Sequence, residues 1–146
     1  MKAEASCFVD APAQAIYDLL ADYRDGHGRI LPIRYFPKLE VLEGGKGHGT
    51  VVKTTTRVLG TSRDFRMRVS EDEPGRVLSE HDLDSDLVTR FVIDPADPNL
   101  SRVTIATTWT RRDGVAGWIE AQLMRLLMQG MYRAELAQLM RLFPVN

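Results

Sequence analysis

A chain of 146 residues with a formal net charge of −1 is long enough to bury one hydrophobic core, and it lacks the basic excess of nucleic-acid-binding proteins. Its single cysteine cannot form a disulfide within the chain, and no apolar run is long enough to cross a membrane. The first residues do not resemble a signal peptide. We therefore expect one cytoplasmic domain over residues 1–146, with no nucleic-acid partner and no integral membrane segment.

Turn residues divide the chain into two helical regions separated by strands. A short strand ending near Val9 comes first, and Asp10 is the expected N-cap of a helix from Pro12 to Ala21. Residues 22–32 contain two glycines and predict a short second helix. Alternating polar and apolar residues then predict strands at residues 36–42, 49–59, 62–71, 76–83, 87–94 and 100–111. A long helix from about Val115 to Phe143 closes the chain.

The order of these elements predicts an α+β fold with one curved antiparallel sheet of six to seven strands. Such a sheet has one apolar face that must be covered. The last helix, with about 28 residues at about 1.5 Å each, would span about 42 Å and is the only element long enough. A helix held in the grip of a curved sheet tends to enclose a cavity, which favours a protein that binds apolar small molecules.

Side-chain alternation predicts which strand residues face this cavity. The expected inward sets are Val52, Thr54, Thr56 and Val58; Phe65, Met67 and Val69; Thr89, Phe91 and Ile93; and Val103, Ile105, Thr107 and Trp109. The strand at 76–83 is ambiguous. We favour the face with Ser79 and His81 inward over the face with Glu80 and Asp82, because it buries fewer charges.

The last helix is apolar around most of its first half and has an ordinary apolar stripe in its second half, with Glu135 expected outside. Gly130 costs helix stability, so it either allows close packing or leaves room for a ligand. The excess of apolar residues in the first half could also form a homodimer contact.

Several phrases of the sequence resemble one family. They are Ala11–Tyr23, Leu42–Gly45, Gly47–Val52, Glu73–Leu78 and Ser101–Thr110, and together they are similar to the polyketide cyclase/dehydrase and lipid-transport family. This family belongs to the helix-grip superfamily, with START domains and pollen-allergen-like proteins. The resemblance implies a helix-grip fold, with two short helices after the first strand. It implies little about chemistry, because one fold hosts many functions.

Three functions remain open at this stage. The first is noncovalent binding or transport of a hydrophobic small molecule, such as a lipid, a polyketide or an isoprenoid-like compound, without a cofactor. The second is a polyketide-type cyclase or dehydratase, which two or more convergent titratable groups would favour. The third is a non-enzymatic module that dimerises through its last helix. The predicted ligand-binding residues are Tyr23, Ile30, Thr54, Thr56, Phe65, Met67, Val69, Thr89, Phe91, Ile93, Ile105, Thr107, Trp109, Leu123, Leu127, Gly130 and Met131.

Residues that could carry chemistry are few. His81 is the best candidate for a general acid or base, because an imidazole titrates near neutral pH. His27 and His48 lie beside glycines, and we expect both to be solvated. No group of His, Cys, Asp or Glu has metal-ligand spacing, so no metal site is predicted.

Overall fold

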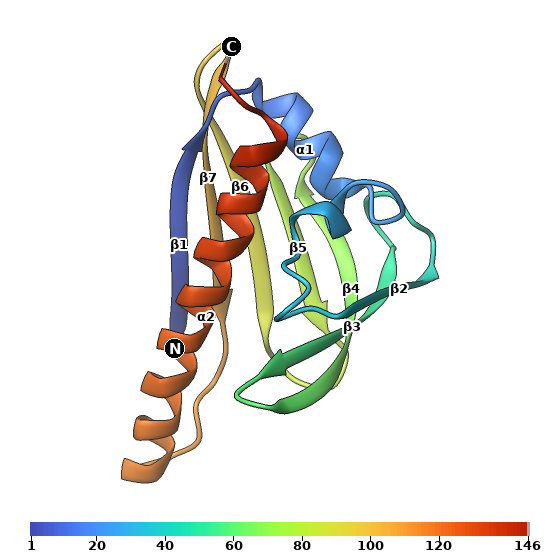
Figure 1. Ribbon diagram of the computed structural model, residues 1–146. Helices are drawn as coiled ribbons and strands as arrows, with labels where there is room; N and C mark the ends of the chain where they lie inside the picture. The colour runs from blue at the N-terminus through green and yellow to red at the C-terminus, as the bar shows by residue number, and fades with distance from the viewer. Residues whose placement is uncertain (146) are drawn as a thin grey trace.

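The computed structural model describes residues 1–145 as a seven-stranded antiparallel sheet crossed by one long helix (Figure 1). This arrangement is the helix-grip fold expected from the sequence. The elements are β1 (Lys2–Val9), α1 (Ala13–Ala21), the 3-10 helix η1 (His27–Ile30), β2 (Lys38–Glu43), β3 (Val51–Val58), β4 (Thr61–Glu73), β5 (Val77–Asp82), β6 (Val88–Asp97), β7 (Leu100–Thr108) and α2 (Gly114–Leu142).

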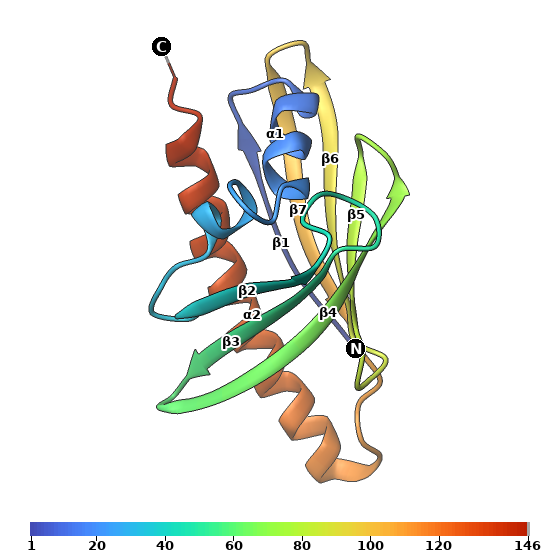
Figure 2. The same ribbon diagram turned by 90° about the vertical axis from the view of Figure 1, so that its right-hand side faces the viewer.

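The strands lie in the order β1-β7-β6-β5-β4-β3-β2. From β2 to β7 each strand therefore pairs with the next one along the chain, as antiparallel strands joined by short turns can. β1 is the exception, because it pairs with β7 from the far end of the sequence. Figure 2 shows the sheet bending so that β2, β3 and β4 curl toward α2. The inner face of the sheet therefore lies opposite the helix.

The turn between β3 and β4 has two residues with positive φ, Leu59 at 53° and Gly60 at 76°. Two such residues in succession match the right-handed twist of the strands that they join. The turn thus lets β3 and β4 continue as one long curled hairpin.

Most of the core lies between the sheet, α1 and the second half of α2. Its largest fully buried side chains include Ile16, Leu20, Leu78, Ile105 and Leu139. A smaller cluster of Ala3, Trp109 and Ala121 ties the start of β1 to α2. A hydrogen bond also connects the start of the chain to the residue after β7: the amino group of Met1 donates to the carbonyl oxygen of Trp109 over 2.7 Å.

The first half of α2 extends beyond the sheet (Figures 1 and 2). Its exposed apolar side chains are Val115, Trp118, Ile119, Leu123 and Leu126. The apolar surface predicted around this part of the helix is therefore real, and the homodimer contact stays a prediction. Within residues 1–145, no helix combines the length and the apolar character that crossing a membrane requires.

The sequence located every strand, with the ends of the strands shifted by up to three residues, and three further details differ. The N-cap of α1 is Pro12 rather than Asp10, with no side-chain hydrogen bond to the helix. β6 continues through Pro95 to Asp97, because a register shift there accommodates the proline without a ladder hydrogen bond. The third difference is the face of β5.

The inward face of β5 carries Glu80, not His81, so the preferred assignment was wrong. Glu80 pairs with Val69 on one side and with Thr89 on the other, and both of these point inward. Residues opposite each other on neighbouring strands share a face. The prediction counted the charges on each face, but the half-buried carboxylate of Glu80 has partners on the inner side in Tyr23 and His27.

Candidate functional site

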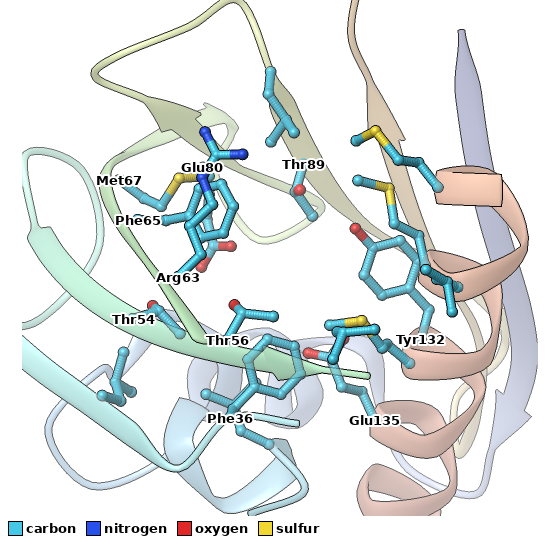
Figure 3. A pocket seen from close by; sticks show the side chains of 18 of the residues that line it. Phe36, Thr54, Thr56, Arg63, Phe65, Met67, Glu80, Thr89, Tyr132 and Glu135 are labelled. Atoms are coloured by element: carbon cyan, nitrogen blue, oxygen red, sulfur yellow. The ribbon is translucent and has the colours of Figure 1, made fainter. Parts of the chain in front are cut away.

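A cavity of about 350 Å³ lies between the curled sheet and α2 (Figure 3). Most of its lining is apolar, with a few polar side chains among the hydrophobic ones. The lining residues are His27, Leu31, Phe36, Leu39, Thr54, Thr56, Val58, Thr61, Arg63, Phe65, Met67, Glu80, Leu87, Thr89, Phe91, Met124, Leu127, Met128, Met131, Tyr132 and Glu135. Both the volume and the composition are typical of pockets that hold a small organic molecule.

One wall of the cavity belongs to α2. Met124, Met128 and Tyr132 follow one another at intervals of four residues, and Glu135 continues the stripe three residues later. This spacing keeps side chains on one face of a helix. Methionine side chains adapt to irregular shapes, so this wall can adjust to a bound molecule.

The opposite wall contains the half-buried carboxylate of Glu80, which has two partners. The hydroxyl of Tyr23 donates a hydrogen bond of 2.6 Å to Oε2 of Glu80, and Nε2 of His27 lies 3.6 Å from the same oxygen. Burial, together with the neighbouring charge of Glu80, raises the pKa of Tyr23 well above its ordinary value. Tyr23 therefore remains a hydrogen-bond donor at neutral pH.

His27 is buried rather than solvated, which corrects the expectation from sequence. Its ring stacks on Tyr23 with centroids 4.3 Å apart and meets the edge of Phe91 at 5.1 Å. Gly26 makes this placement possible, because a Cβ at that position would lie 2.2 Å from the carbonyl oxygen of Leu19. The glycine that suggested a solvated loop instead lets the chain approach α1.

The tautomer of neutral His27 follows from its contacts. Nδ1 lies 2.8 Å from the carbonyl oxygen of Leu20, which can only accept a hydrogen bond. Nδ1 must therefore carry the proton, and Nε2 of the neutral ring is left as an acceptor next to Glu80. When Nε2 is protonated, His27 and Glu80 form an ion pair.

Glu135 brings a second carboxyl group to the cavity, from α2. The residue is only 3% exposed. Burial raises the pKa of Glu135 well above its ordinary value, and the nearby charge of Glu80 raises it further. The raised pKa favours the neutral carboxylic acid, which can donate a hydrogen bond or a proton to a bound molecule. Glu135 therefore faces the cavity, and the expectation that it lies outside was wrong.

A chain of hydroxyl groups connects the sheet with α2. Oγ1 of Thr89 lies 2.7 Å from Oγ1 of Thr107, which is hydrogen-bonded in turn to the hydroxyl of Tyr132. Burial raises the pKa of Tyr132 above its ordinary value, so the phenol stays neutral. These hydrogen bonds hold the ring of Tyr132 at the cavity wall.

The structure brings eight of the predicted ligand-binding residues to the cavity and places nine elsewhere. Those at the wall are Thr54, Thr56, Phe65, Met67, Thr89, Phe91, Leu127 and Met131. Tyr23 and Thr107 lie behind the wall, where they hydrogen-bond to lining residues. Ile30, Val69, Ile93 and Ile105 belong to the solid core, because the cavity does not extend along the full length of the sheet.

The remaining three predicted residues lie away from the cavity. Trp109 follows the end of β7 and packs in the smaller cluster, although Met124 and Met128 touch both that cluster and the cavity. Leu123 is 53% exposed on the projecting part of α2. A Cβ at Gly130 would have no atom within 4 Å, so close packing does not explain this glycine, and Gly130 is not among the residues that line the cavity.

His81 lies on the outer face of the sheet and does not reach the cavity. Its Nε2 lies 3.0 Å from Oγ of Ser70, which donates a hydrogen bond of 2.9 Å to Asp72. Ser79 also donates a hydrogen bond to Asp72, and this bond contributes most to lowering the pKa of that carboxyl. The serine lies between the histidine and the aspartate, so the order needed for a nucleophilic triad is absent.

The residues that the sequence analysis missed are mostly polar or from the helices. Glu80, Glu135 and His27 were expected to face solvent. Arg63 is exposed but reaches the rim of the cavity, where its guanidinium lies 4.7 Å from the centre of the Phe65 ring. His48 is exposed, and residues 1–145 contain no group of three or more His, Cys, Asp or Glu that could hold a metal ion.

Comparison with known proteins gives a consistent result for the whole chain. The sequence pattern of the polyketide cyclase / dehydrase and lipid transport family matches residues 1–143. No curated protein sequence matches the chain.

Similar solved structures share the fold over nearly their whole length. The KanY protein has a TM-score of 0.83 and 27% identity, covering 97% of this chain and 95% of that one. The Zhui aromatase/cyclase from Streptomyces sp. R1128 has a TM-score of 0.79 and 20% identity, with 96% and 91% covered. A START superfamily protein from Mycobacterium smegmatis has a TM-score of 0.73 and 14% identity, with 97% and 96% covered.

Proposed function

The chain belongs to the polyketide cyclase / dehydrase and lipid transport family, and from this premise we propose that it binds a hydrophobic small molecule noncovalently between sheet and α2. The observation that carries the proposal is the cavity of about 350 Å³ with its largely apolar lining. A lipid, a polyketide or an isoprenoid-like compound would bury its apolar body there, which contributes about 25 cal/mol for each Å² removed from water. The polar groups of the lining would orient it.

Filling the cavity should abolish binding. In Met128→Trp, a larger side chain would project from α2 into the space that the ligand needs. We expect this variant to lose at least about tenfold in affinity, since a ligand excluded from the cavity loses most of its buried area. Leu126→Trp is the matched control, because Leu126 is 66% exposed on the same helix and should leave affinity unchanged.

The measurement begins with native mass spectrometry of the purified protein, which identifies any copurified ligand. Its affinity, or that of the tightest compound from a panel of apolar molecules, is then measured for both variants by calorimetry. Equal affinities of Met128→Trp and the unaltered protein would show that the ligand lies outside this cavity.

Acid-base catalysis is a second candidate function, and the two carboxyl groups of the cavity favour it. Glu80 with His27 can accept a proton, and burial of Glu135 favours the protonated form that can donate one, so the two sides suit opposite roles in one reaction. In dehydration of a β-hydroxyketone, Glu80 or His27 would remove the proton next to the carbonyl. Glu135 would protonate the leaving hydroxyl, which departs as water.

This candidate predicts which residues control turnover. Glu80→Gln and Glu135→Gln should each lower the rate of enone formation at least about 100-fold, the usual contribution of general acid-base catalysis. His81→Ala should lower thermal stability and leave turnover unchanged, because its side chain is on the outer face of the sheet. Enone formation is followed by ultraviolet absorbance. A rate that falls with His81→Ala but not with the glutamate variants would reject the assignment.

A further inference from the structure

Glu135 is a buried acid without a partner. Among residues 1–145, no side chain or backbone group forms a hydrogen bond or an ion pair with its carboxyl group, although the residue is only 3% exposed and lines the cavity. Among the same residues, every side-chain oxygen that is completely shielded from solvent has a hydrogen-bond partner. The carboxyl oxygens of Glu135 have no partner, so they are not completely shielded and must border the open space of the cavity. A buried polar group is costly unless something pairs with it, which makes a ligand the natural partner.

The groups around Glu135 create a negative environment. Glu80 from β5 is the nearest acid, and its own partners are Tyr23 and His27. Tyr23 and Tyr132 are phenols that remain neutral. His27, from η1, already approaches Glu80 with its only free nitrogen. The one other basic side chain at the cavity, Arg63 of β4, is exposed and lies against Phe65.

These charges distinguish three kinds of ligand. A carboxylate would meet Glu80 and Glu135, and the buried basic residue His27 already faces Glu80, so the cavity should reject fatty acids in their ionised form. A neutral alcohol or ketone could hydrogen-bond to Glu135 but would leave the negative environment unchanged. A cation would neutralise it and would give the Glu135 carboxylate its missing ion-pair partner.

We propose that the ligand of this cavity carries a protonated amine, which binds to the carboxylate of Glu135, and an apolar body that fills the remaining space. The inference rests on the proposed function, because it names the class of molecule bound at the same site. Binding converts the Glu135 carboxylic acid into a carboxylate and releases its proton to solvent, while the amine stays protonated. Binding of the amine should therefore release protons to solvent, up to one for each molecule bound.

The test uses ligands that differ only in the head group. The aromatic set is 9-(aminomethyl)anthracene, 9-anthracenemethanol and anthracene-9-carboxylate, and the aliphatic set is decylamine, decanol and decanoate. Calorimetry at pH 7 should give the amine at least a tenfold higher affinity than the alcohol and no detectable binding of the carboxylate. Repeating the titration in phosphate and in Tris, whose ionisation enthalpies differ, should show proton release with the amine and none with the alcohol.

Two variants connect the preference to the residue. Glu135→Gln keeps the size of the side chain but cannot become charged, so it should reduce the amine to the affinity of the alcohol and abolish proton release. Glu120→Gln is the matched control, because Glu120 lies exposed on α2 and pairs with Arg112, and it should keep the preference.

The outcomes separate this inference from the proposed function. If the alcohol binds as tightly as the amine, or if the preference survives in Glu135→Gln, the cavity binds apolar molecules but the amine inference is wrong. If the carboxylate binds most tightly, Arg63 rather than Glu135 determines the ligand class, and the inference is also wrong. If no member of either set binds, the proposed function fails and the inference fails with it.

Discussion

Replacing Phe91 with alanine is expected to lower the free energy of unfolding by about 3 kcal/mol. Phe91 is 2% exposed, packs in the main core and supports the ring of His27 from its edge. Truncation of a buried phenylalanine costs about 3–5 kcal/mol, and the lower end applies because part of this ring already faces the cavity. Urea denaturation followed by circular dichroism measures the change.

Phe8→Ala provides the control for this prediction. Phe8 is 56% exposed on β1, so the same chemical truncation should change stability by less than about 0.5 kcal/mol. Similar losses in the two variants would mean that Phe91 is not part of a closed core. The Phe91→Ala variant should also change the affinity for any ligand of the cavity, since removing the ring enlarges the cavity next to His27.

Glu135→Gln is expected to make the protein more stable, by an amount that grows with pH. The unfolded chain ionises this carboxyl near its ordinary pKa of 4.5, whereas burial keeps it protonated in the folded state. Above pH 4.5 the folded state therefore holds more protons than the unfolded state, and stability falls as pH rises until the raised pKa is reached. Glutamine has no proton to lose, so it removes this penalty.

Stability curves between pH 4 and pH 8 test the prediction. The two proteins should have similar stability near pH 4, and the advantage of the variant should increase by up to about 1.4 kcal/mol for each pH unit within the window. Glu120→Gln should show no such increase, because Glu120 is exposed. An advantage of Glu135→Gln that stays constant with pH would mean that the carboxyl ionises normally in the folded protein.

Both predictions concern residues on faces that sequence periodicity can identify only in part. Alternation assigned Met67 and Thr89 to the inner face correctly, since apolar and polar residues take turns clearly in those strands. In β5 both faces carry polar residues, and only the register set by β4 and β6 decides between them. Register depends on pairing between strands, which a single strand's sequence does not contain.

The polar part of the site was hidden from sequence for a related reason. The inward face of β5 was chosen as the face with fewer charged residues, on the assumption that the interior is apolar. A cavity can nevertheless contain acids when tyrosine and histidine side chains are available as partners. Tyr23 and Glu80 are 57 residues apart, so their hydrogen bond exists only after folding. Glu135 did carry a signal, because it lies four residues from both Met131 and Leu139, which are buried on the same face of α2.

The pairing of β1 with β7 determines when the domain can become complete. Ala5 pairs with Ile105 across 100 residues, whereas every other strand pairs with a neighbour in sequence. Among the strands, α2 packs chiefly against β1, so this helix cannot dock fully until β1 is in place. Closing the longest loop is the slowest contact to form, and until then β7 presents an open edge to other chains. β1, which precedes the other six strands in the sequence, is therefore expected to be the last to join the sheet, and deletion of residues 1–9 should cause aggregation rather than a simple gain of flexibility.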